Sequence, residues 1–339
     1  MGTKTRTGRK CVFCGGTPDN KTKEHVLPMW LIEATGDPKE PVNLGINRTT
    51  GKPQFFPFKS LVLPACDDCN AVFSVLEEKA ARVVKGLFVR AAFTEEDARV
   101  LLDWLDKVRI GLWLWELSMA SQAIKFVPRY HIYSRLREKD RLVFIVPLED
   151  DLRGMSFFGT QTHAFVHSPS CFGLAINNVA LLNVSFDYLL ARRLGFPYME
   201  SWHSLGHGKP EFGFLRPGSG TIMTPMLPGR LQFPGIAIGQ CLFGPNLEND
   251  EAKKLYQTAA VGQYCSDYEG ESTIFVGNSS TVKPFADFDG PIFDRSAKVP
   301  HYERTFRGLS WSWKIGQGAK VYSCDERGIR NENETAIYG

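Results

Sequence analysis

The sequence lacks any apolar run long enough to cross a membrane. Its most apolar segment, residues 100–119, contains five charged side chains that would be costly in hydrocarbon: Asp103, Asp106, Lys107, Arg109 and Glu116. The basic N-terminal residues lead into Cys11 and polar residues, without the apolar region of a secretory signal. We therefore expect a cytoplasmic protein with no membrane partner.

The chain also has little excess charge and few cysteines. Its 40 Lys and Arg residues against 37 Asp and Glu give a net charge of +3, so overall electrostatics do not demand a polyanionic partner. Eight cysteines in 339 residues are too few for a disulfide-dense scaffold. Four of them form two Cys-x-x-Cys pairs, a spacing that favours a metal site in a reducing compartment.

The hydrophobic fraction of 43% in 339 residues predicts about two domains with substantial cores, and the expected fold class is α+β. Apolar runs such as RLVFIVPL and CFGLAINNVALLNVSF, as well as YHIYSRL, indicate strands after about residue 128. The predicted parts are a basic mobile arm (1–10), a zinc-binding module (11–80), a helical hairpin packed on it (81–127) and a larger β-rich C-terminal domain (128–339).

The helical hairpin is predicted from apolar side chains at helical spacing. Thr94 and Asp97 form a plausible capping pair between the two helices. The expected core stripe of the first helix consists of Val72, Leu76, Val83, Leu87 and Ala91, and that of the second of Leu101, Leu105, Val108, Leu112, Trp115 and Met119.

The two Cys-x-x-Cys pairs predict a closed zinc site. Cys11 with Cys14, and Cys66 with Cys69, can each present two thiolates from one tight turn, and Gly15 and Gly16 supply a permissive backbone after the first pair. Four sulfurs leave no open coordination position, so we assign the Zn²⁺ a structural role. A redox role for the pairs is disfavoured, because no thioredoxin-like βαβ pattern surrounds either one.

Function is expected in the insertion between the two pairs, which contains Glu24-His25-Val26-Leu27-Pro28. An acidic residue and His followed by Pro, lying between two Cys-x-x-Cys pairs with Asn70 directly after the last cysteine, resembles the HNH (ββα-metal) endonuclease family in its four-cysteine zinc subgroup. The resemblance covers residues 11–77. It implies a zinc-stapled ββα-metal module that hydrolyses phosphodiester bonds, in DNA rather than RNA.

The resemblance also implies roles for individual residues. His25 would be the general base for a water nucleophile, and Glu24 and Asn70 would hold one divalent ion, Mg²⁺ or Mn²⁺, against the scissile phosphate. These roles suit the residue types, since imidazole accepts protons near neutral pH and oxygen ligands suit hard cations. The family usually has an asparagine shortly before the second cysteine pair to orient the histidine, and Ser60 is the nearest candidate here.

The sequence leaves other interpretations open. His25 could be a structural histidine in a non-catalytic zinc module that binds nucleic acid or a protein partner. Two histidine pairs spaced i, i+4, at 163/167 and 203/207, fall in predicted strand and loop, which disfavours a second metal site. A set of basic residues could track phosphates or be a solvated surface: Arg129, Arg135, Arg137, Lys139, Arg141, Arg192 and Arg193.

The sequence therefore predicts an HNH-type nuclease module followed by a β-rich domain of unknown role, which could carry a protein partner or an oligomer contact. By analogy with proteins of this layout, we expect a role in bacterial anti-phage defence or in mobile-element biology.

Overall fold

The computed structural model describes residues 10–18, 22–36, 39, 41–46, 53–120, 131–133, 136, 141–148, 150, 153–158, 160, 165, 169, 171–184, 198–199, 202–204, 210–212, 215–216, 236–240, 274–277, 282–288, 322–325 and 328–331. Residues 1–9 of the predicted arm lie outside them. So do six of the predicted basic-surface residues (129, 135, 137, 139, 192 and 193) and the histidines at 163, 167 and 207.

The N-terminal part contains a small antiparallel pair of strands that leads into a long helix. Strand β1 pairs with β4 in the register Glu24 to Leu63 and His25 to Val62, and β2 pairs with β3. The elements are β1 (Thr22–His25), α1 (Met29–Thr35), β2 (Pro41–Ile46), β3 (Pro53–Pro57), η1 (Phe58–Ser60), β4 (Val62–Ala65) and α2 (Asp67–Phe88). We call β1, β4 and α2 the ββα unit.

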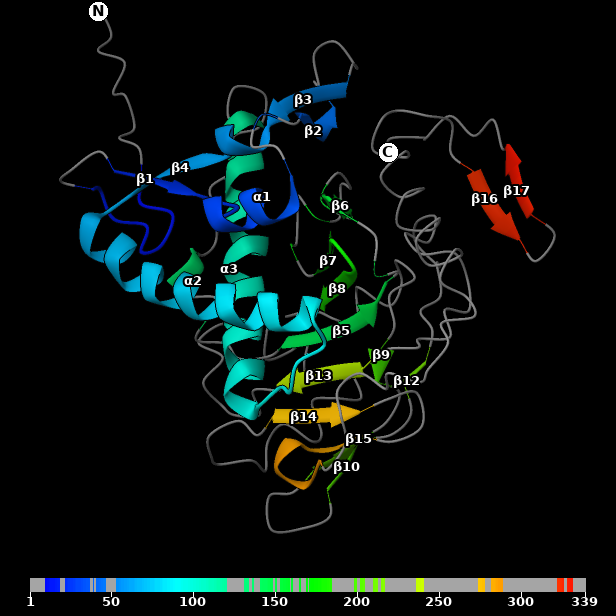
Figure 1. Cartoon of the computed structure of the whole chain (residues 1–339). Coiled ribbons are helices and arrows are strands. Elements are labelled where there is room, and N and C mark those ends of the chain that lie inside the picture. The colour runs from blue at the N-terminus through cyan, green and yellow to red at the C-terminus, as the bar shows by residue number, and fades with distance from the viewer. Residues whose placement is uncertain are drawn as a thin grey trace, which may run out of the picture.

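Helix α2 and helix α3 (Glu95–Ala120) form the predicted hairpin, and they cross in front of the sheet (Figure 1). The predicted capping pair is present: the Thr94 N–H donates to Asp97 Oδ2 at 2.9 Å, and the Asp97 N–H donates to Thr94 Oγ1 at 3.1 Å. Helix α2 continues through residue 80, so the boundary predicted there falls inside a helix.

The predicted core stripes are correct at most positions and wrong at three. Val72 is 59% exposed, Met119 is 49% exposed, and Ala91 is an exposed residue beyond the end of α2. The buried face of α2 is instead formed by Phe73, Ala80, Val83, Val84 and Leu87. Helix α3 is buried around most of its circumference, because it lies between β4 on one side and the sheet on the other.

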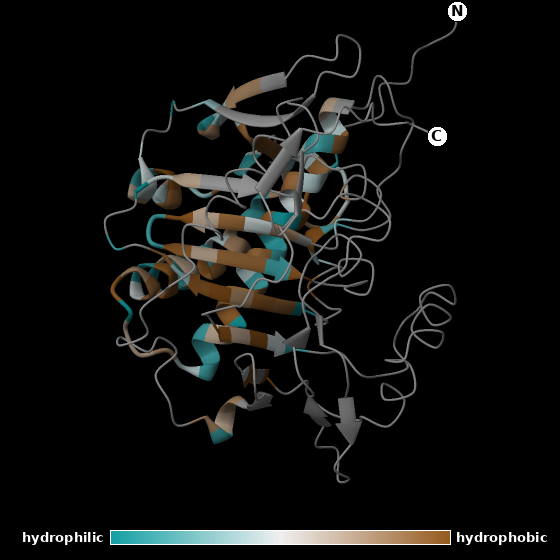
Figure 2. Cartoon of the chain, turned by 90° about the vertical axis from the view of Figure 1, so that its right-hand side faces the viewer, coloured by the Kyte–Doolittle hydropathy of each residue, from teal (hydrophilic) through white to brown (hydrophobic). Residues whose placement is uncertain are grey.

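The C-terminal part contains a seven-stranded antiparallel sheet in the order β15-β14-β13-β5-β8-β7-β6. Its strands are β5 (Arg141–Pro147), β6 (Met155–Phe158), β7 (Cys171–Ile176), β8 (Val179–Val184), β13 (Ile236–Gln240), β14 (Ile274–Gly277) and β15 (Val282–Pro284). Apolar residues run along its central strands (Figure 2), and every described residue of β8 and β13 is buried. These strands are therefore covered on both faces.

In the described residues that follow the hairpin, three two-stranded pairs lie outside this sheet: β9 with β12, β10 with β11, and β16 with β17. Their bounds are β9 (Tyr198–Met199), β10 (Trp202–Ser204), β11 (Pro210–Phe212), β12 (Leu215–Arg216), β16 (Tyr322–Asp325) and β17 (Gly328–Asn331), and a short helix, η2 (Phe285–Asp287), follows β15.

The strand prediction for YHIYSRL is wrong at the described positions: Ile132, Tyr133 and Leu136 are helical. The N–H groups of Ile132 and Tyr133 donate to the carbonyls of Val12 and Phe13 at 3.2 and 2.9 Å. This segment therefore packs on the first cysteine loop and forms no strand there.

One hydrophobic core runs from the first cysteine loop through α3 to the sheet. The turn between β7 and β8 adds polar links, since Asn177 Nδ2 donates to the carbonyl of Ala34 in α1 and Asn178 Nδ2 to that of Phe88 in α2. The turn between β7 and β8 thus contacts both α1 and α2. Among the described residues, no helix is long and apolar enough to span a membrane.

Candidate functional site

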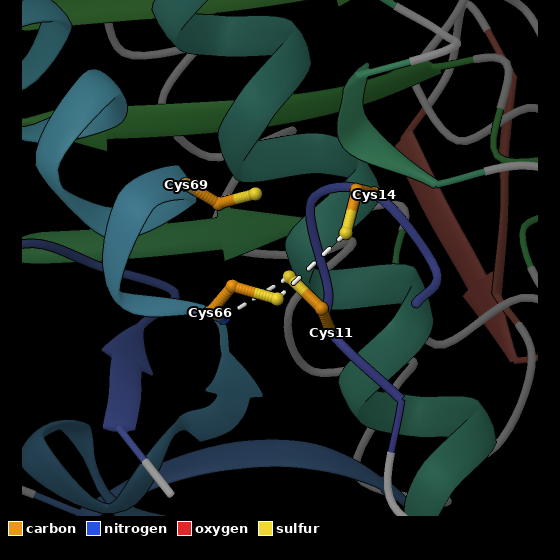
Figure 3. A group of neighbouring side chains, drawn as sticks. All are labelled: Cys11, Cys14, Cys66 and Cys69. Atoms are coloured by element: carbon orange, nitrogen blue, oxygen red, sulfur yellow. Dashed lines mark hydrogen bonds between the residues drawn. The ribbon is translucent and has the colours of Figure 1, made fainter. Parts of the chain in front are cut away.

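The four predicted zinc ligands lie together. The sulfur atoms of Cys11, Cys14, Cys66 and Cys69 are all within 4.8 Å of one another and point toward a common centre (Figure 3). A tetrahedral Zn²⁺ with bonds of about 2.3 Å would separate its sulfurs by about 3.8 Å. The Sγ atoms of Cys14 and Cys66 are 3.9 Å apart, so this cluster fits a structural zinc site.

The chain supports these sulfurs with backbone hydrogen bonds and tunes their pKa values unequally. Burial alone would raise the pKa of Cys11, but N–H groups of the two cysteine loops donate to its sulfur and bring the pKa below the ordinary 9.0. Burial and the neighbouring sulfurs raise the pKa of Cys66 to about 11 and that of Cys69 to about 12. Without a cation, Cys66 and Cys69 therefore keep their protons at neutral pH, and a metal must displace them.

Gly15 lies at the tightest point of the first cysteine loop. Its φ of +74° is in the left-handed region that favours glycine, and a Cβ there would lie 2.6 Å from Nδ1 of His131. The His131 ring therefore packs directly against the loop, on a segment that follows α3. The sequence indicated a permissive backbone at Gly15, but it gave no sign of the histidine above it.

Glu24 is buried in an ion-paired cluster. Its Oε1 pairs with Nζ of Lys107 in α3, and the same ammonium lies 2.5 Å from Oε1 of Glu77 in α2. Burial raises the pKa of Glu24, Lys107 opposes this, and Glu77 adds to it. The two carboxylates raise the pKa of Lys107 despite its complete burial, so the lysine remains protonated. One ammonium between two carboxylates leaves a net negative charge.

His25 follows Glu24 at the end of β1 and is half-buried. Successive side chains of a strand point to opposite faces, so His25 and Glu24 leave β1 in different directions. Burial lowers the pKa of His25, with Lys107 and Lys23 adding to the effect and Glu77 opposing it. The imidazole is therefore neutral at pH 7, and its buried Nδ1 has no hydrogen-bond partner in the described part of the chain.

Asn70 is half-buried in the first turn of α2, where its N–H donates to the carbonyl of Cys66 at 2.9 Å. It shares a helix face with Glu77, seven residues on. Ser60, predicted to orient His25, is exposed, and its Oγ donates to the carbonyl of Pro57 at 2.7 Å. Its hydroxyl is thus not bonded to Nδ1 of His25, and no other described residue takes that position.

Two residues of this site, Lys107 and Glu77, were missed by sequence reasoning. In the sequence, Lys107 served only to show that residues 100–119 are too charged to cross a membrane. Glu77 served only as the last residue of the region covered by the resemblance. The available signal was a lysine in the middle of an apolar helical pattern, since a buried lysine requires an acidic partner.

The prediction that Arg141 belongs to a basic surface is wrong, because this residue is buried. Its guanidinium pairs with Asp103 and Asp106 of α3 and donates to Oε1 of Gln240 at 2.8 Å. It is therefore neither a phosphate contact nor a solvated surface residue. Of the predicted histidine pairs, only His203 is described, in strand β10.

In comparisons with protein-family models, curated proteins and solved structures, the chain matched none of them.

Proposed function

We propose that this chain is a divalent-metal-dependent endonuclease of the HNH type that hydrolyses phosphodiester bonds in DNA. The observation that carries the proposal is the ββα unit: β1, which ends in Glu24 and His25, pairs antiparallel with β4, and β4 leads through Cys66 and Cys69 into α2 with Asn70 in its first turn. This order of strand, strand and helix is the one that the resemblance implies.

The state of His25 agrees with a general base. A neutral imidazole can take a proton from a water molecule at pH 7, and the half-buried ring keeps part of its surface open to solvent. Attack of that water on phosphorus would leave 3′-hydroxyl and 5′-phosphate ends.

Glu24 and Asn70 are the residues proposed to hold Mg²⁺ or Mn²⁺. The donor set fits a hard cation, since both offer oxygen, and the net negative charge of Glu24, Lys107 and Glu77 also favours a cation nearby. When bound, such an ion neutralises charge on the leaving 3′-oxygen. Two protein oxygens fill few positions, so water and substrate phosphate would complete the coordination.

The pairing of Glu24 with Lys107 also favours a second candidate function. A buried carboxylate that neutralises a buried lysine has a structural role of its own, as a non-catalytic zinc module would require. Such a module would bind nucleic acid or a protein partner without cutting. A DNA substrate, a place in anti-phage defence and a partner contact through the C-terminal part remain proposals from the resemblance and the layout.

A plasmid-nicking assay separates the two functions. Wild-type protein should nick supercoiled DNA with Mg²⁺ or Mn²⁺ but not in EDTA, and His25→Ala should lower the rate by about 10²- to 10⁴-fold while zinc content and DNA affinity stay unchanged. His203→Ala, in β10 outside the ββα unit, is the control and should cleave as wild type does. Cleavage by His25→Ala at the wild-type rate would place the active site elsewhere.

A further inference from the structure

Lys107 lies at the junction of three elements. Its side chain is completely buried in α3, and Nζ contacts Oε1 of Glu24 from β1, Oε1 of Glu77 from α2 at 2.5 Å, and the backbone carbonyl oxygen of His25 at 3.1 Å. An ammonium has three N–H donors and no acceptor. Glu77 Oε1 and the His25 carbonyl accept hydrogen bonds from this ammonium, and the Glu24 carboxylate adds an ion pair.

A second contact brings α3 against the same end of β1. A Cβ on Gly111, one helical turn after Lys107, would lie only 3.1 Å from Cγ1 of Val26. Val26 follows His25 directly and donates its N–H to the carbonyl of Leu61 at 2.8 Å. Helix α3 thus contacts residues 24–26 through an ion pair, a backbone hydrogen bond and close packing.

This arrangement restricts how β1 and α2 can move relative to each other. A buried ammonium that loses an oxygen partner is strongly disfavoured, because no water replaces the lost hydrogen bond. Moving the backbone of His25 away from Glu77 would break one of the three contacts. The position of the His25 backbone is therefore coupled to α2, the helix that carries Asn70.

We propose that Lys107 is a positioning residue: its ammonium holds the His25 backbone in register with α2 and so places the general base. The proposal rests on the nuclease function proposed above, and it assigns a role in that site to a helix outside the zinc loops. A displacement of about 1 Å in a catalytic group can reduce a rate by about 100-fold, so a residue that only positions His25 can have a large effect on kcat.

The chain offers a matched control for this test. Arg141 is also completely buried and bridges two carboxylates, Asp103 and Asp106. It lies in strand β5 of the sheet and contacts Gln240 of β13, away from β1. The test variant is Lys107→Met/Glu77→Gln, and the control is Arg141→Met/Asp103→Asn. Each removes a buried cation together with the more exposed of its two carboxylates.

Two measurements are made on the full-length, zinc-loaded variants at a temperature where both are folded. The first is plasmid cleavage, separated into kcat and KM. We expect the test variant to lose about 100-fold in kcat with little change in KM, and the control to stay within about threefold of wild type. Lys107→Arg keeps the charge and the hydrogen-bond donors, so its kcat should be at least about tenfold higher than that of the test variant.

The second measurement does not depend on cleavage: hydrogen exchange of the peptide spanning residues 22–28. Exchange should become faster in the test variant and stay unchanged in the control. If wild type cuts no DNA, the nuclease proposal fails, and faster exchange in the test variant alone still supports Lys107 as the residue that positions β1. Equal losses of kcat in test and control, or unchanged exchange in the test variant, would overturn the positioning role.

Discussion

Replacing Gly15 with alanine tests the geometry of the first cysteine loop. Gly15 has a φ of +74°, and an added Cβ would lie 2.6 Å from Nδ1 and 2.7 Å from Cε1 of His131. The ring cannot easily retreat, because the next two residues, Ile132 and Tyr133, are hydrogen-bonded to the loop itself. The variant therefore suffers backbone strain and a steric clash in the conformation that brings the sulfurs together.

The backbone contribution alone sets a lower limit on the effect. Holding a residue with a Cβ in the left-handed region costs about 1–2 kcal/mol. A metal-free loop can relax, so this strain opposes zinc binding, and the zinc Kd should rise by about 5- to 30-fold before the clash is added. Gly16→Ala is the control, since its Cβ would lie 3.4 Å from the nearest atom, Sγ of Cys14, and its zinc Kd should change by about twofold or less.

Competition with a chromophoric chelator gives the zinc Kd of each variant at fixed pH. Gly15→Ala/His131→Ala then separates the two contributions, because it removes the clash and keeps the backbone strain. A Gly15→Ala protein that binds zinc as tightly as Gly16→Ala would refute the described loop geometry.

Three further predictions follow from the pKa shifts and from the proposed metal ligands. Cys66 and Cys69, with pKa values of about 11 and about 12, keep their protons at neutral pH and must release them to zinc. Zinc affinity should therefore rise at least about 100-fold per pH unit near neutrality, and a flat pH profile, measured with the same chelator, would contradict this. Because burial lowers the pKa of His25 below its ordinary 6.5, cleavage should persist at neutral pH and fall only below pH 6.5. If kcat/KM already falls with decreasing pH above pH 6.5, this would argue against His25 as the base. Asn70→Ala should raise the Mg²⁺ concentration for half-maximal cleavage and lower the maximal rate, with partial rescue by Mn²⁺, and an unchanged metal titration would count against Asn70 as a ligand.

Sequence alone was sufficient where the structure depends on local chemistry. The spacing of Cys11 with Cys14 and of Cys66 with Cys69 brings each pair of sulfurs into one turn. Because zinc prefers four tetrahedral thiolate ligands, the two pairs were expected to lie together, and they do. The capping pair of Thr94 and Asp97 correctly placed the start of α3, because both partners lie within one helical turn. The run CFGLAINNVALLNVSF was predicted only as β structure, and the fold divides it into β7 and β8, which are joined by two residues.

Only the tertiary structure decided which charges are buried and what they contact. Lys107 and Glu24 are 83 positions apart in the sequence, and Arg141 and Gln240 are 99 apart, so no local pattern encodes these pairs. Helix α3 is covered on opposite sides by β4 and by the sheet, so charged residues outside its predicted apolar stripe, such as Lys107 and Arg109, are also buried. Their partners depend on how separate elements pack, because a buried charge is stabilised by whichever oppositely charged group the fold places beside it. The four-cysteine cluster was therefore predictable from spacing, whereas the surroundings of His25 were determined by packing.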